Sequence, residues 1–469
     1  MNITSQLSQF CAGLSVAALP PPVVRRTCQL LLDLTGNMIR ARHDAESTPP
    51  LLAMARAAGF TGGSARVFAD AHGYTPVGAA LVNGVLAHSL DFDDTHAAGT
   101  LHPGAPVIPA ALAAGELTGA SGADVLAGIV AGYEVTCRIA VALPAGDHYQ
   151  RGFHPTATCG VFGAAAAAGR VLGLDDRGIA AALGIALSQS AGSLQFLANG
   201  AWTKRFQVGW AAMGGFVAAM LAREGFKGAA EPLEGKHGFL AAYAPHPQPA
   251  RAVQDLGIVF ELMATAVKPY PSCRYGHAGI DAVLALRRQY GFVPREVDRI
   301  TYGLSHAGML LVGAPADKKA NPQNIVDGQF SGPFVLSAAL VTGAMNWDSY
   351  ARLNDPAIRG LLPKVVCEHD PEIEAEFPAN MSGKVTIDAR GERFTQKVVV
   401  PKGEPGNFLT DDELRAKFGS LAEPVLGAAR TDTLAQALLG FDRAPKAASV
   451  FEIANGPQPV IPARAGISQ

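Results

Sequence analysis

A chain of 469 residues, 49% of them hydrophobic, is long enough for two or three domains and too apolar for general disorder. Charged residues make up 17% of it and balance to a net charge of about −2, which argues against a nucleic-acid-binding surface and an acidic solvating tail. The six cysteines show neither CxxC spacing nor the density of a secreted disulfide scaffold, so we expect free thiols in a reducing, cytoplasmic protein.

No segment predicts a membrane span or a signal peptide. The apolar run near the N-terminus lacks a basic flank and is interrupted by three consecutive prolines, residues 20–22. The uncharged run 178–203 contains too many serine, glutamine and asparagine residues for a bilayer. We therefore expect a soluble protein with no membrane partner.

Residues 24–262 predict helices throughout. The segment LVNGVLAHSL carries apolar residues on one helical face, and GVFGAAAAAGRVLGL and GWAAMGGFVAAMLAREG are rich in alanine and glycine. Small side chains of this kind let neighbouring helices approach closely. No segment alternates with period two, so a sheet is not expected in this region.

After residue 264 the pattern changes to an α+β mixture. REVDRITYGLS and KVVCEHD predict strands, KVTIDARGERFTQKVVV predicts a hairpin turning near Arg390 and Gly391, and helices are expected at 278–290 and 324–342. The tail returns to helix, with Thr410 and Glu413 forming a capping box and another helix near 431–440. The prediction is a mostly α protein: helical residues 1–263, a smaller α+β domain at 264–403, and C-terminal helices at 404–469 that complete the helical domain.

The stretch AHSLDFDDTHAAGTLHPG, residues 87–104, concentrates aspartates and histidines in a charge-poor chain. Three chemistries compete for it. DFDDT fits the Asp-x-Asp-x-Thr pattern of haloacid-dehalogenase-type phosphotransferases, but that pattern belongs at the end of a parallel strand, and the residues before it are helical. A divalent metal could bind among the carboxylates and imidazoles of Asp91, Asp93, Asp94, His88, His96 and His102, although no helical ligand pair supports it. The third possibility is acid/base work by a histidine that carboxylates hold in place.

Other scarce polar residues favour the third possibility over simple helix capping. His154 precedes a helix that Thr156 or Thr158 could cap, and Lys204 stands in a nearly uncharged region. A proline-stiffened hinge between the predicted domains carries the four polar residues Lys268, Cys273, Arg274 and His277. Cations near a cleft between domains are typical of an anion-binding site.

These motifs, in order, resemble the MmgE/PrpD family. They are HSLDFDDTH…LHPGAPVIPAALAAGE, GYEV, GFHPTATCGVFGAAAAAG, TKRFQVGWAA, GFKG…LEGKHGF and KPYPSCRYGHAGID, and the resemblance spans about residues 10–405. Its members include 2-methylcitrate dehydratase, cis-aconitate decarboxylase and iminodisuccinate epimerase. The resemblance implies a homodimer with an all-α domain built from both chain ends, a smaller α+β lid, an active site between the two, and no metal or organic cofactor.

By motif match, the resemblance implies site residues in both domains. The residues implied in catalysis are Asp91, Thr95, His102, His154 and Lys204. Lys268 is implied in binding the substrate, and we add Cys273, Arg274 and His277 from the same hinge as candidates.

Three departures from the family pattern bear on the reaction. Cys273 stands where the decarboxylase has a histidine, Phe334 stands where a tyrosine can be supplied, and the interval from Asp91 to His102 is one residue longer. With these departures, the resemblance implies a cofactor-independent lyase of a small di- or tricarboxylate, most simply a dehydratase acting on a 2-methylcitrate-like hydroxy acid. Epimerisation, decarboxylation and a catalytically inactive anion-binding protein stay open as alternatives.

Overall fold

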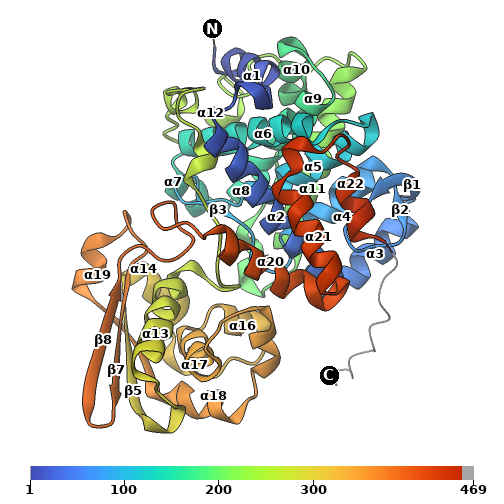
Figure 1. Ribbon diagram of the computed structural model, residues 1–469. Coiled ribbons are helices and arrows are strands. Elements are labelled where there is room, and N and C mark those ends of the chain that lie inside the picture. Colours follow the sequence, from blue (N-terminus) through green and yellow to red (C-terminus); the bar gives the residue numbers. More distant parts are fainter. Residues whose placement is uncertain (1, 457–469) are drawn as a thin grey trace. The chain divides into compact units, whose positions relative to one another are not determined.

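The computed structural model describes residues 2–456, which divide into two compact units. One unit, called here the helical unit, is Met1–Ala266 together with Thr410–Gln469. The other, the α+β unit, is Val267–Leu409. Helices dominate the first, and the only sheet of more than two strands among the described residues lies in the second, so the fold is mostly α with a smaller α+β part (Figure 1).

The helical unit is built from helices drawn from both ends of the chain. Its helices are α1 (Ile3–Gly13), α2 (Pro21–Asp44), α3 (Thr48–Ala57), α4 (Pro76–Ala87), α5 (Gly104–Thr118), α6 (Gly122–Ala142), α7 (Ala145–Gln150), α8 (Pro155–Thr158), α9 (Gly160–Val171), α10 (Asp176–Ala186), α11 (Thr203–Arg223), α12 (Phe239–Tyr243), α20 (Asp411–Leu426), α21 (Ala428–Leu439) and α22 (Ser449–Ala454). The capping box at the start of α20 is confirmed: Thr410 Oγ1 accepts from the Glu413 N–H, and the Glu413 carboxylate accepts from the Thr410 N–H.

Glycines let the central helices approach closely, as the sequence predicted. A Cβ added to Gly84 in α4 would lie 2.8 Å from Gly209 Cα in α11, and one added to Gly209 would lie 2.5 Å from the Leu81 carbonyl oxygen. Real Cβ atoms do not approach other atoms so closely, so the crossing of α4 and α11 requires glycine at both positions. This crossing brings the C-terminal end of α4 toward the N-terminal turn of α11, where the candidate site lies.

Short strands in the helical unit correct the expectation of no sheet between residues 24 and 262. β1 (Thr61–Arg66) pairs antiparallel with β2 (Gly73–Tyr74), and β3 (Thr95–His96) pairs antiparallel with β4 (Thr265–Ala266). Three of these strands have two residues and β1 contains two glycines, so no stretch is long enough to show period-two alternation. None is a parallel strand followed by the DFDDT motif, which excludes the phosphotransferase interpretation.

Helix α6 is the one helix of the described residues that is long and apolar enough to cross a membrane. Its apolar 18-residue stretch is completely buried within the protein, and the helix carries the buried Glu134–Arg138 ion pair, N–O distance 2.9 Å. A core helix of a globular protein meets the same test of length and composition. Residues 178–203, the run considered from the sequence, instead form α10, short 3-10 turns and loop.

The α+β unit has a four-stranded sheet in the order β6-β5-β7-β8. Its strands are β5 (Val297–Leu304), β6 (Val365–His369), β7 (Gly383–Ala389) and β8 (Glu392–Val398); β5 and β6 are parallel and the other pairs antiparallel. Its helices are α13 (His277–Tyr290), α14 (His306–Gly308), α15 (Ala316–Lys319), α16 (Ile325–Gln329), α17 (Gly332–Thr342), α18 (Pro356–Leu361) and α19 (Pro371–Glu376). All four predicted strands are confirmed, and both residues of the predicted hairpin turn, Arg390 and Gly391, have positive φ.

One helix prediction in this unit needs correction. Residues 324–342 form two helices, α16 and α17, separated at Ser331. The Ser331 side chain accepts from the Phe334 N–H and so begins a new helix, with a proline inside its first turn. Phe334, where the resemblance allows a tyrosine, is fully buried and stacks on Tyr350 with ring centroids 5.7 Å apart.

Candidate active site in the helical unit

The acidic stretch begins where α4 ends. His88 is the C-terminal cap residue of α4, and the chain then turns sharply through Asp91, whose φ of +53° lies in the left-handed region. Aspartate tolerates this conformation better than most residues because its short side chain can hydrogen-bond locally. The turn leaves the side chain of Asp91 15% exposed while that of Asp93 is fully buried.

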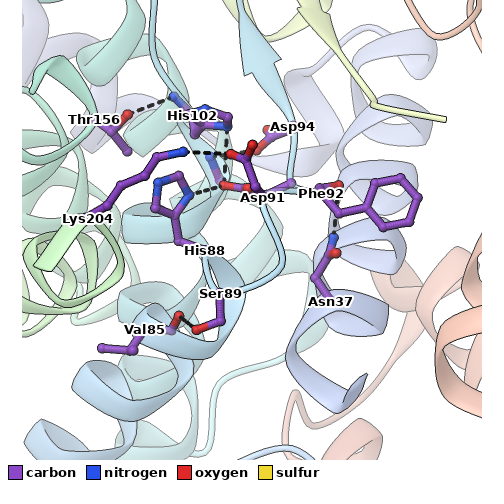
Figure 2. Close-up of polar contacts among 12 residues, drawn as sticks. Asn37, Val85, His88, Ser89, Asp91, Phe92, Asp94, His102, Thr156 and Lys204 are labelled. Carbon is purple, nitrogen blue, oxygen red and sulfur yellow. Dashed lines mark hydrogen bonds and ion pairs between the residues drawn. The ribbon is translucent and has the colours of Figure 1, made fainter. Parts of the chain in front are cut away.

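Three histidines gather around this turn. Figure 2 shows two of them, His88 and His102. His88 Nδ1 lies 2.7 Å from Asp93 Oδ2, and His102 Nδ1 lies 3.4 Å from the same oxygen. The ring of His88 is 4.8 Å from that of His102 and 5.9 Å from that of His154, centroid to centroid. The two histidines that the resemblance implies in catalysis, His102 and His154, therefore flank a third that it did not name.

Lys204, in the first turn of α11, completes the cluster. Its Nζ lies 2.6 Å from Asp91 Oδ1. Figure 2 shows the Lys204 side chain directed toward Asp91. Burial acts to lower the pKa of Lys204, but the charge and hydrogen bond of Asp91, with Asp93 and Tyr149, outweigh burial and raise it. Lys204 is therefore a cation at neutral pH, held in a region with few other positive charges.

The pKa of His154 is lowered, whereas that of Lys204 is raised. His154 is 2% exposed, and its ring lies 5.5 Å from that of Phe196. Burial, and then electrostatic interaction with His88 and Lys204, hold the pKa of His154 well below the usual value. At neutral pH the His154 imidazole is thus uncharged and able to accept a proton.

The main chain on both sides of the His102 side chain is fixed by hydrogen bonds. The His102 N–H donates to Thr156 Oγ1 at 3.2 Å, so Thr156 does not cap its own helix, and neither does Thr158. Asp94 accepts from the Gly104 N–H at 3.2 Å and from the Tyr133 hydroxyl at 2.7 Å. Complete burial, with the neighbouring Asp93 carboxylate, raises the pKa of Asp94 to about 7 despite these donors.

Thr95 and His96 follow the cluster but have different surroundings. Thr95 pairs with Ala266 between β3 and β4, and its buried hydroxyl makes no hydrogen bond to any described residue. His96 Nε2 lies 2.9 Å from Glu261. Within residues 2–456 no hydrogen bond joins the Thr95 hydroxyl to the clustered histidines, so its implied catalytic role stays a prediction.

The four candidates from the hinge belong to the α+β unit. Arg274 makes an ion pair with Glu404 at 2.6 Å, and His277 Nε2 lies 3.2 Å from the Ser272 carbonyl oxygen. The buried Cys273 donates its N–H to the Gln329 carbonyl, and Lys268 is 5% exposed. Arg274 and His277 thus have structural partners inside their own unit, and the binding roles of all four residues stay predictions.

His88, Asp93 and His102 also meet the simplest requirement for a metal site, because one donor atom from each lies within 4.8 Å of the others. Two ligands of a tetrahedral zinc, each about 2.0–2.1 Å from the ion, keep about 3.3 Å apart. His88 Nδ1 and Asp93 Oδ2 are 2.7 Å apart, which is a hydrogen-bond distance. The geometry favours a hydrogen-bonded chain over a ligand set.

Sequence reasoning assigned no catalytic role to His88 and Asp93, which it considered only as metal ligands. Both were visible in the motif HSLDFDD, but the spacing of five residues between them follows no helical or strand period. The left-handed turn at Asp91 is what brings them together, and a single sequence does not reveal it.

Two family models match most of the chain. The model of the MmgE/PrpD N-terminal domain matches residues 5–252, and that of the MmgE/PrpD C-terminal domain matches residues 270–440. The chain belongs to the MmgE/PrpD family.

Curated relatives of this family member match it along almost their whole length. A cis-aconitate decarboxylase-like protein of Aspergillus oryzae is 28% identical over 97% of this chain and 98% of its own. The cis-aconitate decarboxylase of Aspergillus terreus is 26% identical over 97% and 96%, and that of Mus musculus is 28% identical over 91% and 88%. The family is thus one of enzymes, and these relatives are named for a lyase reaction on a carboxylate.

Proposed function

We propose that this protein is a lyase acting on a small di- or tricarboxylate, with proton transfer by histidine and charge stabilisation by lysine. The main support for the proposal is that one cluster in the helical unit contains both a protonated lysine, Lys204, and a neutral buried histidine, His154. Family membership supports the same reaction class.

Lys204 supplies the positive charge that the reaction needs. Removing a proton from the carbon next to a carboxylate places negative charge on the carboxylate oxygens, and a fixed cation in a partly dehydrated site stabilises that charge more than water does. Asp91 holds the ammonium group in place at 2.6 Å. A substrate carboxylate would approach the same ammonium group and share it with Asp91.

His154 and His102 supply the two proton transfers. In dehydration one neutral histidine takes the Cα proton while a protonated histidine gives its proton to the departing hydroxyl; a C–H and a C–O bond break, a C=C bond forms and water leaves. The lowered pKa of His154 makes it the proposed base. His102, beside a carboxylate that favours its protonated form, is the proposed acid.

Decarboxylation is the second candidate, and full-length similarity to cis-aconitate decarboxylases favours it. There the C–C bond to a carboxylate breaks, CO₂ leaves and the carbanion takes a proton from a histidine. Cys273 and Phe334, at positions where the decarboxylase pattern differs, argue for dehydration as the first choice.

The test is a panel of hydroxylated and unsaturated di- and tricarboxylates, incubated with chelator-treated protein in D₂O and followed by mass spectrometry and proton NMR. We expect loss of water from a hydroxy acid; loss of CO₂ would select the second candidate. Deuterium exchange into the substrate, with no loss of water or CO₂, would indicate an epimerase. Binding without turnover or exchange would overturn the proposed lyase activity.

A further inference from the structure

One carboxylate oxygen faces two histidines in the candidate site. Asp93 Oδ2 lies 2.7 Å from His88 Nδ1 and 3.4 Å from His102 Nδ1. The side chains of His88 and Asp93 are completely buried, whereas that of His102 is 15% exposed. Of the three, His102 is therefore the one that a substrate can reach.

The chemistry of these groups fixes where the protons are. An ionised carboxylate only accepts hydrogen bonds, so the His88 nitrogen that faces it at 2.7 Å carries the proton. If His102 Nδ1 also faces the carboxylate as a donor, the neutral ring of His102 keeps its lone pair on Nε2. Such contacts are often long before a substrate binds and shorten in the reacting complex, which fits the 3.4 Å distance.

Hydrogen bonds already fix the main chain around His102. Contact with Asp93 therefore acts on the orientation of the His102 ring. Thr156 fixes its backbone N–H, and Asp94 fixes the Gly104 N–H two residues later. These hydrogen bonds hold the main chain but leave the His102 side chain able to rotate.

We propose that Asp93 and His88 are positioning residues for His102: Asp93 orients the ring and fixes its tautomer, and His88 orients Asp93. The inference rests on the proposed function for the identity of the substrate on which His102 acts. The inference extends the proposed function by naming the residues that orient His102, the proposed general acid.

Other charged groups surround the pair from several elements. Lys204 in α11, Asp33 in α2 and the adjacent Asp94 each interact electrostatically with Asp93. His154 lies on the other side of His88. A pH profile therefore has to be compared between variants that leave all of these groups in place.

Asp93→Asn keeps the shape of the side chain and removes its charge. We expect kcat to fall about 10²–10⁴-fold, the usual range for disabling an acid or base, with KM changed much less. Because the neutralised variant no longer stabilises the His102 imidazolium, the limb of the pH profile that reports on this histidine should move to lower pH. An unchanged kcat and profile would overturn the proposal.

If Asp93→Asn folds poorly, a pair of variants at His88 tests the contact between His88 Nδ1 and Asp93 Oδ2. His88→Asn retains an amide nitrogen near the position of Nδ1, whereas His88→Leu has no donor. We expect about a tenfold loss of kcat for leucine and substantial recovery for asparagine. Equal losses in both would contradict a role through Asp93.

Histidine NMR of the whole protein separates this inference from the proposed function, because it needs no turnover. With His102 assigned through His102→Gln, its titration midpoint should fall by about one pH unit in Asp93→Asn. Glu116→Gln, which removes another buried carboxylate that pairs with Arg66 at 2.8 Å, should leave it unchanged. An identical midpoint in wild type and Asp93→Asn overturns the inference, whereas inactivity of the wild type toward every carboxylate overturns only the function.

Discussion

Asp91 combines an unfavourable backbone conformation with a strong side-chain contact. A left-handed non-glycine residue costs of order 1 kcal/mol, and the turn that requires it also places Asp91 Oδ1 2.6 Å from Lys204 Nζ. Backbone strain retained at such a point is typical of functional sites. Here the turn separates the two aspartates, one toward the lysine and the other toward the histidines.

Lys204→Met should reduce kcat/KM by about 10²–10³-fold, because the negative charge formed in the reaction loses its fixed cation. The charge of Lys204 also helps to lower the pKa of His154, so its removal should raise that pKa. The activity that remains should therefore need a higher pH than the wild type requires. Steady-state kinetics across pH with circular dichroism as a folding check measure both effects.

Arg205→Met is the matched control for that prediction. Arg205 is the next residue in α11 and hydrogen-bonds to Ser47 Oγ at 3.1 Å. Arg205 also interacts electrostatically with Asp91, but its hydrogen bond is to a neutral hydroxyl and not to the carboxylate, so we expect kcat/KM within about threefold of wild type. Comparable losses in the two variants would show that general charge, and not the position of Lys204, controls the rate.

Asp94 should make stability depend on pH in an unusual direction. Its pKa is about 7 in the folded protein against 3.8 for the ordinary side chain, so the folded state binds more protons than the unfolded state between those values. The contribution of Asp94 to stability is present below about pH 4 and is lost as the pH rises to 7, by about 1.4 kcal/mol per unit within that window.

Asp94→Asn keeps the shape and removes the titration, so its melting temperature should fall less than that of wild type between pH 5 and 7. Scanning calorimetry of both proteins in the same buffers measures the difference. Parallel curves would mean that Asp94 is ionised throughout.

At the scale of elements, α20 supports residues 87–104, called here the acidic loop, although it lies far away in the sequence. Lys417 Nζ lies 2.5 Å from Asp33 Oδ1 in α2, donates to the Phe92 carbonyl at 2.9 Å and lies 3.8 Å from the centre of the Phe92 ring. Lys417 and Asp33 are both nearly inaccessible to solvent. Burial raises the pKa of Asp33, against the attraction of Lys417.

Lys417→Met should destabilise the protein by about 3–5 kcal/mol, because it leaves a buried carboxylate without its counter-charge. The double variant Lys417→Met/Asp33→Asn should recover a large part of this loss. Urea unfolding followed by the far-ultraviolet signal of the helices gives both values. A double variant no more stable than the single one would show that the loss comes from packing around the lysine stem.

The elements predicted best from the sequence are those with local signals. The capping box of α20 and the Arg390–Gly391 hairpin depend on residues three apart or adjacent, and both are confirmed. The break at Ser331 and the strands β1–β4 were missed, because a cap inside an apolar run and strands of two residues leave no periodicity.

The candidate site was only partly predicted, because several of its contacts also lack a local sequence signal. Asp91, His102, His154 and Lys204 meet in one unit, yet only the family motifs indicated that they would. The contacts of Asp93 and of Lys417 depend on a left-handed turn and on a partner 325 residues away, and neither has a local sequence signature.

At the scale of the whole molecule, the α+β unit is one continuous segment inserted into the helical unit. Its own core includes the fully buried Tyr302, Phe334 and Ile387, and its sheet has four strands. Independent stability of a sheet needs three or more strands with a hydrophobic face, or packing against a helix, and this unit meets that requirement.

A fragment of residues 267–409 should therefore fold by itself. We expect well-dispersed amide resonances and a cooperative thermal transition from the isolated fragment. A fragment with the narrow dispersion of an unfolded chain would show that the unit needs the rest of the protein to fold.

The contact between Lys417 and Phe92 also sets an order of events during biosynthesis. Ribosomes add about 5–20 residues per second, so the 325 residues between the two partners take roughly 15–65 s to translate. Throughout that interval the nascent chain contains Asp33 without its counter-charge and the acidic loop without its support. The candidate site can thus reach its final form only near the end of translation, although each of its three clustered histidines was made in the first third of the polypeptide.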